Sequence, residues 1–119
     1  MHNIEIIFYR NKNNKCPVEE FLDALDWKEA QKIAWVFKAI KEVENVSKLY
    51  FKKLSGTDDI WECRIRCNKK SIRIFCFFAS ESNLILTNGF FKKDNKAPIN
   101  EIKKAKNYRK DYFERVKNG

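Results

Sequence analysis

The sequence has no apolar run long enough to cross a bilayer. Its longest apolar stretches, such as 74–79, fall far short of the roughly 20 residues that a membrane-spanning helix requires. The N-terminus is polar and then strand-like, and it lacks the pattern of a secretory leader. We therefore expect a protein that is not embedded in a membrane and that lies in the cytoplasm.

Patterns that bind metal ions are also missing. The chain has four cysteines and a single histidine, His2, but no C-x-x-C pair, so the spacing typical of a zinc site does not occur. An exported disulfide scaffold would normally carry a leader. We expect no metal and no cofactor, and we expect buried, reduced thiols at Cys16, Cys63, Cys67 and Cys76.

The length and composition favour a single folded domain. A chain of 119 residues with 44% hydrophobic residues can bury one core of modest size. No linker, repeat or low-complexity segment divides it. We expect one domain over residues 1–119.

The positive charge is the clearest feature that the sequence does contain. The net charge of +9 suggests a nucleic acid, another polyanion or an acidic protein as partner. Most of the excess follows residue 51, and the segment 92–117 alone holds ten cations and four anions. This segment could attract an RNA backbone, or it could be a set of solvated lysines on an amphipathic helix.

The N-terminal half predicts a strand followed by two helices. Ile4–Tyr9 is short and rich in strand-forming residues. Pro17 stands where a helix can begin, and Asp26 with Glu29 forms a capping-box pattern for a second helix that runs to about Ser47. These helices form a hairpin whose apolar seam suits either the domain's own sheet or a partner helix.

The C-terminal half predicts an antiparallel meander and a final helix. Three alternating segments, Ile60–Cys67, Ser71–Ala79 and Leu84–Phe91, are separated by short polar turns. Pro98 opens a helix with an apolar stripe of Ile102, Ala105, Tyr108, Tyr112 and Val116. The expected class is α+β with the element order β-α-α-β-β-β-α.

A charged group on the first meander strand is the best candidate for chemistry. Glu62, Arg64 and Arg66 alternate with apolar residues, so they project from one side of the strand. Arg73 on the next strand can lie close to them, and Lys92 with Lys93 could complete the rim. Guanidinium groups bind phosphate oxygens in a fork geometry, so the group suits a phosphodiester. The alternative is ordinary cross-strand ion pairing on a solvated sheet face.

Further contacts with RNA can be proposed around this group. Lys52 and Lys53 precede the meander and could bind the backbone, with Arg66 in a secondary role. Phe91 could stack on a base, although in a chain with ten Phe most must pack in the core.

Several motifs resemble one protein family when they are taken in order. The pattern comprises Leu-x-Gly, Trp-Glu-x-Arg, Arg-x-aromatic, Gly-Phe-x-Lys-Lys, and a proline followed by Glu-Ile. This order resembles the HigB-like, phage-derived branch of the RelE/ParE toxin superfamily. Residues 1–53 agree only in their layout. The motifs are Leu54-Ser55-Gly56, Trp61-Glu62-Cys63-Arg64, Arg73-Ile74-Phe75, Gly89-Phe90-Phe91-Lys92-Lys93, Pro98 and Glu101-Ile102.

The resemblance implies a toxin of a type II toxin–antitoxin pair. Its fold would be an N-terminal strand and a helical hairpin packed on a curved antiparallel sheet, followed by a C-terminal helix. Many such toxins cut mRNA in the ribosomal A site without a metal ion: the ribose 2′-OH attacks the adjacent phosphate and a 5′-OH leaves. The expected partners are the ribosome, mRNA and a helix-turn-helix antitoxin.

The resemblance also assigns roles by position. Arg64 and Arg73 fall where the family holds the phosphate, and Lys92 with Lys93 falls where basic or acid–base groups lie. Glu62 is the candidate general base. Many relatives carry histidine at the position of Asn88, and an asparagine cannot exchange a proton.

Two other functions stay open at this point. The ParE branch of the same fold inhibits DNA gyrase by binding it, without catalysis. The chain could also be a phage-derived RNA-binding module that is not toxic.

Overall fold

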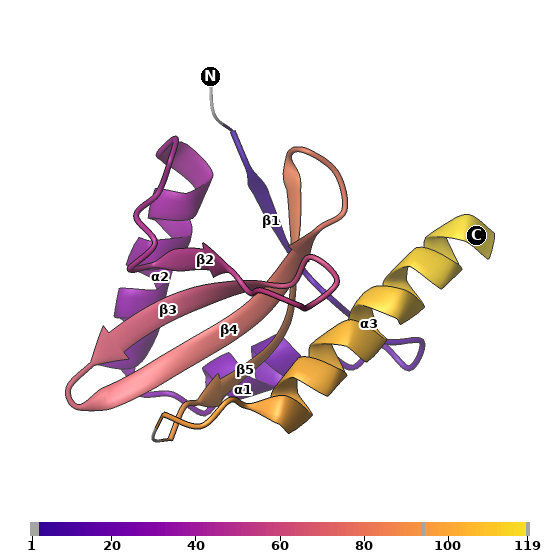
Figure 1. Ribbon diagram of the computed structural model, residues 1–119. Coiled ribbons are helices and arrows are strands. Elements are labelled where there is room, and N and C mark those ends of the chain that lie inside the picture. Colours follow the sequence, from indigo (N-terminus) through magenta and orange to yellow (C-terminus); the bar gives the residue numbers. More distant parts are fainter. Residues whose placement is uncertain (1–2, 94, 119) are drawn as a thin grey trace.

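The computed structural model describes residues 3–93 and 95–118; His2 lies outside these ranges. Figure 1 shows a twisted sheet with helices on both sides. The described residues form five strands and three helices in the order β1 (Glu5–Phe8), α1 (Pro17–Asp23), α2 (Trp27–Glu42), β2 (Phe51–Lys53), β3 (Trp61–Cys67), β4 (Lys70–Phe78), β5 (Asn83–Phe91) and α3 (Ile99–Asn118).

The sheet is mostly antiparallel, which confirms the α+β class. Its strand order is β1-β5-β4-β3-β2. The meander β3-β4-β5 is antiparallel as predicted, whereas the edge strand β1 runs parallel to β5. The other edge, β2, was not predicted because three residues are too few for an alternating pattern to be recognised.

Local signals position the two N-terminal helices. Pro17 begins α1, and Asp26 and Glu29 form the predicted capping box at the start of α2. The predicted end of α2 near Ser47 is wrong, since the helix ends at Glu42. Val43 is extended and Asn45 has a φ of 59°, so the backbone leaves the helix and turns toward β2.

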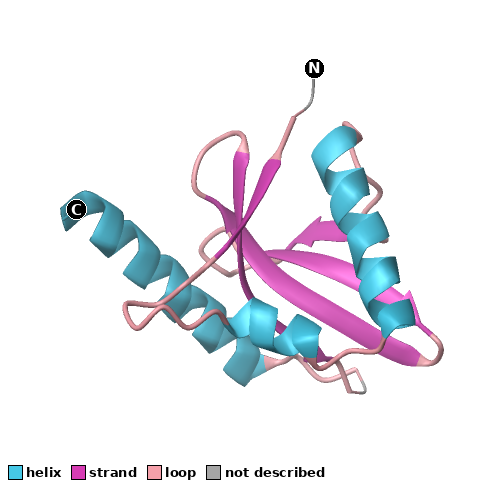
Figure 2. Ribbon diagram, turned by 180° about the vertical axis from the view of Figure 1, so that it is seen from behind, coloured by secondary structure: helices cyan, strands magenta, loops and turns pink. Residues whose placement is uncertain are grey.

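The sheet has a hydrophobic core on each face. Figure 2 shows α1 and α2 on the face opposite α3. The core under α1 and α2 includes Val18, Ile33, Val36, Ile40, Cys63, Ile65, Ile72, Ile74, Leu84 and Leu86. The core under α3 includes Tyr9, Ile60, Phe75, Phe77, Ile85 and Ala105.

A bulge in β5 changes which face its residues occupy. Phe75 pairs with Asn88 and Cys76 pairs with Leu86, so Thr87 is an extra residue in β5. Because side chains alternate along a strand, this insertion moves Asn88 and Phe90 to the face of α3, while Leu84 and Leu86 stay under α1 and α2.

The C-terminal helix packs on the sheet with a stripe slightly different from the predicted one. Ile102, Ala105, Tyr108 and Tyr112 face the sheet as predicted, and Phe113 packs beside them. Val116 does not belong to this core, since its side chain is 62% exposed.

The four thiols are free, and three of them, at Cys16, Cys63 and Cys76, are buried, whereas Cys67 is partly exposed. Burial raises the pKa of Cys76, and its sulfur lies 3.9 Å from that of Cys63. Within residues 3–93 and 95–118, no helix combines the length and the apolar character that crossing a membrane would need.

Candidate nucleic-acid interface

The charged residues of β3 project from the same face of the sheet as α3. Glu62 pairs with Phe75 of the α3-side core, Arg64 pairs with Arg73, and Arg66 pairs with Ser71. We call Glu62, Arg64, Arg66 and Arg73 the arginine cluster. The alternation predicted from the sequence brings all four onto one face of two neighbouring strands.

A buried carboxylate lies at the centre of the arginine cluster. Oε1 of Glu62 is 3.4 Å from Nε of Arg64, and Oε2 is 3.4 Å from Nε of Arg73. The residues Glu62 and Arg73 are only 6% and 9% exposed, while Arg64 is partly exposed and Arg66 is open to solvent. The cluster therefore combines a buried ion pair, Glu62 with Arg73, and an exposed cation, Arg66.

Arg73 keeps unused hydrogen-bonding capacity. Burial lowers the pKa of Arg73, the carboxylate of Glu62 opposes that change, and the charges of Arg64 and Arg66 lower the pKa further. Its Nη1 donates to the carbonyl of Ile72 at 3.2 Å, but its buried Nε makes no hydrogen bond. An excess of cations around one carboxylate favours the approach of an anion.

The lysines after β5 extend the row that begins at Arg66. The backbone N–H of Lys92 donates to the carbonyl of Ser71 at 2.8 Å, and Ser71 pairs with Arg66. Lys92 is partly buried and Lys93 is exposed. Arg66 and Lys92 thus flank Ser71 of β4 from its two sides, and Lys93 lies one residue beyond Lys92.

Three of the predicted RNA contacts have separate surroundings. Lys52 is exposed and pairs in register with Glu62, so it adjoins the arginine cluster. Lys53 binds Asp59 at 2.8 Å, which lowers the pKa of that carboxyl. Phe91 lies on the opposite face, with its ring centroid 5.4 Å from that of Phe21, and so it is not part of the cluster.

Asn88 is buried beneath the start of α3. Its Nδ2 donates to the carbonyl of Glu101 at 3.1 Å and to Oε1 of Glu101 at 3.0 Å, while its Oδ1 accepts from Thr87 at 2.7 Å. Asn88 therefore ties β5 to α3. Sequence reasoning missed the partner Glu101, whose only signal was its place in the motif order.

The aromatic residues near the charges are mainly structural. Phe75 and Phe77 are fully buried, and Phe90 packs edge-on against Phe75 with the ring centroids 5.0 Å apart. The arginine cluster can thus hold an anion above these packed rings. One carboxylate orients two of its guanidinium groups, and further cations lie on its exposed side.

Comparison with known families gives one match. Residues 20–110 match the family described as "Phage derived protein Gp49-like (DUF891)". None of the curated proteins compared with the chain matches it. The matched region begins within α1, extends through most of α3 and contains the whole arginine cluster. The chain therefore belongs to the Gp49-like family of phage-derived proteins, which is related to the RelE/ParE-type toxins.

Proposed function

We propose that this protein is the toxin of a type II toxin–antitoxin pair, of the HigB type, and that it cuts mRNA on the ribosome. The observation that supports this proposal is the arginine cluster, in which Arg64 and Arg73 converge on Glu62 at 3.4 Å each. Its partners would be the ribosome, mRNA and a helix-turn-helix antitoxin that restrains it.

The reaction proposed is an internal transesterification of RNA. The 2′-oxygen attacks the adjacent phosphorus, the bond to the 5′-oxygen breaks, and the products are a 2′,3′-cyclic phosphate and a 5′-OH. Arg64 and Arg73 would stabilise the charge that develops on the phosphate oxygens. No metal ion takes part in this scheme.

The proton transfers are assigned to the groups nearest the cluster. Glu62 would accept the proton of the 2′-OH, and Lys92 or Lys93 would supply the proton to the leaving oxygen. Asn88 takes no part, because its amide cannot exchange a proton and already binds Glu101 and Thr87. Glu62 reaches RNA only if the bound phosphate draws Arg64 away from the carboxylate.

The first test is expression of the chain in a bacterial host. The wild type should arrest growth and translation, with mRNA cut in the A site. Arg64→Ala should slow cleavage about 100-fold or more, since it removes one donor to the developing charge. Arg64 is partly exposed, so this variant should remain folded, and its thermal melting temperature would verify that.

Lys12→Ala is the matched control, because Lys12 is exposed and lies outside the arginine cluster. It should inhibit growth like the wild type. Full toxicity of the Arg64→Ala variant would contradict the phosphate site. Intact mRNA together with DNA damage would contradict the nuclease and favour inhibition of gyrase.

A further inference from the structure

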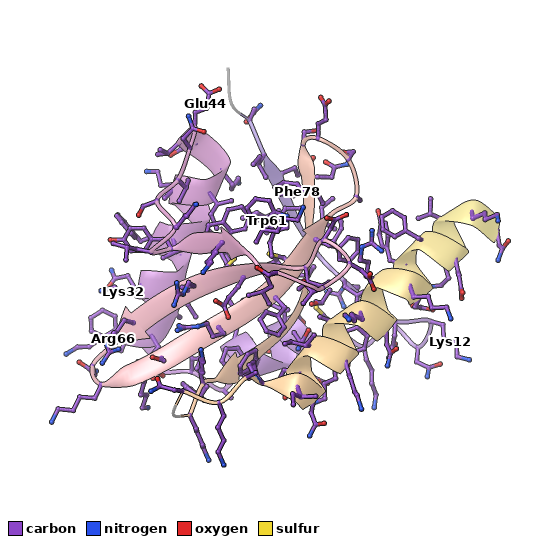
Figure 3. The ribbon with its side chains drawn as sticks, viewed as in Figure 1. Lys12, Lys32, Glu44, Trp61, Arg66 and Phe78 are labelled. Carbon is purple, nitrogen blue, oxygen red and sulfur yellow. The ribbon has the colours of Figure 1, made fainter. Side chains whose placement is uncertain are left out.

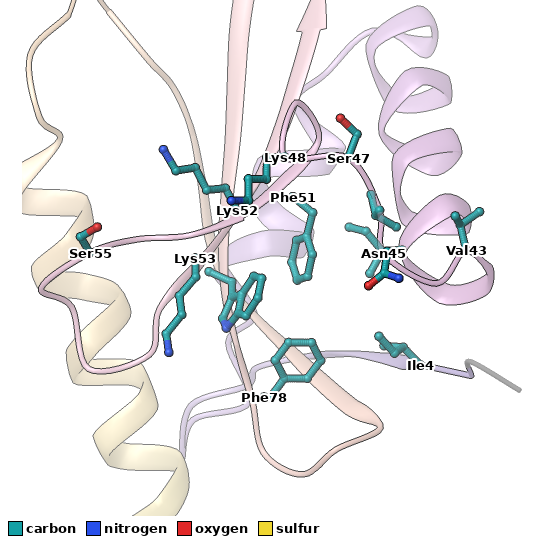
Figure 4. Close-up of a pocket in the computed structure, with 13 residues that line it drawn as sticks. Ile4, Val43, Asn45, Ser47, Lys48, Phe51, Lys52, Lys53, Ser55 and Phe78 are labelled. Carbon is teal, nitrogen blue, oxygen red and sulfur yellow. The ribbon is translucent and has the colours of Figure 1, made fainter.

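A large cavity lies on the opposite face of the sheet from the arginine cluster. It measures about 790 Å³ and lies between the end of α2, the segment 43–48 and the strands β2 and β3 (Figure 4). We call it the aromatic pocket, after its three rings, Phe51, Trp61 and Phe78. Figure 3 shows Trp61 and Phe78 close together between α2 and the turn before β5.

The rings give the aromatic pocket an apolar wall. Phe51 and Trp61 are stacked, with ring centroids 4.7 Å apart and planes 20° from parallel. Phe78 stands edge-on to both, at 6.1 Å and 5.6 Å. Trp61 and Phe78 are only partly buried, so they can contact a planar ligand.

The mouth of the aromatic pocket is positively charged. Lys48, Lys52 and Lys53 line it, and no carboxylate occurs among the described residues that line the cavity. Lys53 is held at the rim by Asp59. A ligand that combines a flat apolar ring with negative charge fits this combination, and a nucleotide has both.

Direct contacts connect the pocket mouth to the arginine cluster. Nη1 of Arg64 donates to the carbonyl of Lys48 at 3.5 Å, although Arg64 also faces Glu62. Lys52 pairs in register with Glu62, and Figure 4 shows its side chain pointing away from the ring of Phe51. The two sites are thus separated only by the edge strand β2, around which a continuous polyanion can pass.

We infer that the aromatic pocket binds an unpaired base of single-stranded RNA whose backbone crosses the arginine cluster. The base stacks on the ring of Trp61 with Phe78 at its edge, and Lys48 and Lys52 neutralise the phosphates that pass over β2. The inference rests on the proposed function in taking RNA as the polyanion. It adds a second contact to the cleavage site, so that the identity of a flanking base affects binding.

Trp61 can report on binding directly. Trp27 and Trp35 are 69% and 53% exposed, so replacing both by Phe leaves Trp61 as the single tryptophan. The probe is a hexaribonucleotide with 2′-O-methyl groups, which cannot be cleaved because it has no 2′-OH nucleophile. Titration with this oligonucleotide should quench the fluorescence of Trp61 until the signal reaches a plateau.

Variants of the pocket should weaken this binding while the fold is retained. Phe78→Leu removes a ring but keeps apolar volume, and it should raise the Kd about fivefold or more. Lys48→Glu should also weaken binding, whereas the same charge change at exposed Lys12 should have a much smaller effect. Far-UV circular dichroism would verify that the variants remain folded.

The outcomes separate this inference from the proposed function. Quenching that depends on Phe78, in a protein that cuts no mRNA, would support the pocket and contradict the nuclease. Cleavage of mRNA with unchanged Trp61 fluorescence and a Phe78→Leu variant of wild-type affinity would overturn the pocket alone. Quenching by an acidic peptide with a central leucine, but not by RNA, would also overturn it.

Discussion

Glu62 is a buried residue that orients the more exposed side chains of the arginine cluster. A buried carboxylate is costly unless cations compensate it, and Arg64 and Arg73 each approach one of its oxygens. In return, the carboxylate fixes the direction of two long side chains that would otherwise be free to move. The order of the arginine cluster therefore depends on a residue that is itself only 6% exposed.

We predict that Glu62→Gln both destabilises the fold and abolishes growth inhibition. The amide keeps the shape of the side chain but leaves Arg73 as a buried cation without a counter-charge, which should cost about 2 kcal/mol of unfolding free energy. Urea unfolding measures this loss. Glu114→Gln, at an exposed position of α3, should leave both properties unchanged, and equal stability of the Glu62→Gln variant would contradict the role assigned to the buried pair.

At this scale the sequence predicted the cluster but not all of its surroundings. Alternation along β3 was sufficient to put Glu62, Arg64 and Arg66 on one face, because a strand has a fixed period of two. It could not place Phe91, which packs against Phe21 on the other face. It also could not show that the amide of Asn88 is bound by Glu101, since that contact depends on where α3 crosses the sheet.

At the scale of elements, a hydrogen bond and ring stacking join α3 to Tyr9, the residue that follows β1. The hydroxyl of Tyr9 donates to Asp111 at 2.5 Å, and the ring of Tyr9 stacks on that of Tyr108 with centroids 4.8 Å apart. Arg115 donates from Nε to the same carboxylate at 3.0 Å. This contact joins residues that are 102 positions apart in the chain.

The Tyr9 contact predicts a loss of stability at high pH. Burial, followed by the hydrogen bond and charge of Asp111, raises the pKa of Tyr9 from 10.0 to about 12. The unfolded chain therefore loses this proton first, so the stabilisation is complete below pH 10 and is lost as the pH rises to 12. Because Asp111 and Arg115 are partly exposed, solvent screens this interaction, and the decrease should be about 1–2 kcal/mol of unfolding free energy.

Tyr9→Phe provides the control for this prediction. The variant lacks the titrating hydroxyl, so its stability should fall less than that of the wild type between pH 10 and 12. Chemical unfolding at several pH values measures both curves, and the other tyrosines and the lysines contribute equally to each. If the unfolding free energies of the wild type and of Tyr9→Phe fell in parallel between pH 10 and 12, the loss of stability could not be assigned to Tyr9.

The elements themselves were predicted where local signals were strong. Pro17 and the Asp26–Glu29 capping box specify helix starts, which depend on neighbouring residues alone. The end of α2 was predicted wrongly and the strand β2 was not predicted, because the segment after Glu42 is set by its packing at the sheet edge. The bulge at Thr87 was not predicted either, since β5 shows no strict alternation of polar and apolar residues in which an inserted residue could be recognised.

At the scale of the whole molecule, the positive charge is concentrated rather than spread evenly. The arginine cluster, the two lysines of β2 and the cations of α3 follow residue 51, whereas Glu19, Glu20 and Asp23 lie on α1. A polyanion should therefore bind from the side of β2, β3 and β4 that α1 does not cover.

This charge distribution predicts that RNA binding depends strongly on salt. If about four phosphates are neutralised, the affinity for the 2′-O-methyl hexaribonucleotide should fall roughly 50-fold between 50 and 200 mM salt. Arg66→Ala should reduce the slope of log affinity against log salt by about 0.7, because Arg66 is an exposed member of the cluster. Lys12→Ala should leave the slope unchanged. Binding that does not depend on salt would contradict the proposed phosphate contacts.

The sequence by itself determined the periodic features of this protein: the meander, the helix starts, the residues that share a face of β3, and the motif order that resembles the toxin superfamily. These features follow from local geometry, in which each residue's direction is set by its neighbours in the chain. The sequence showed that a C-x-x-C pair is missing and that asparagine stands at position 88. Only the tertiary structure decided that three of the four thiols and the side chain of Asn88 are buried. It likewise decided the burial of Glu62 and the aromatic pocket beside β2, because both depend on packing between segments that are distant in the sequence.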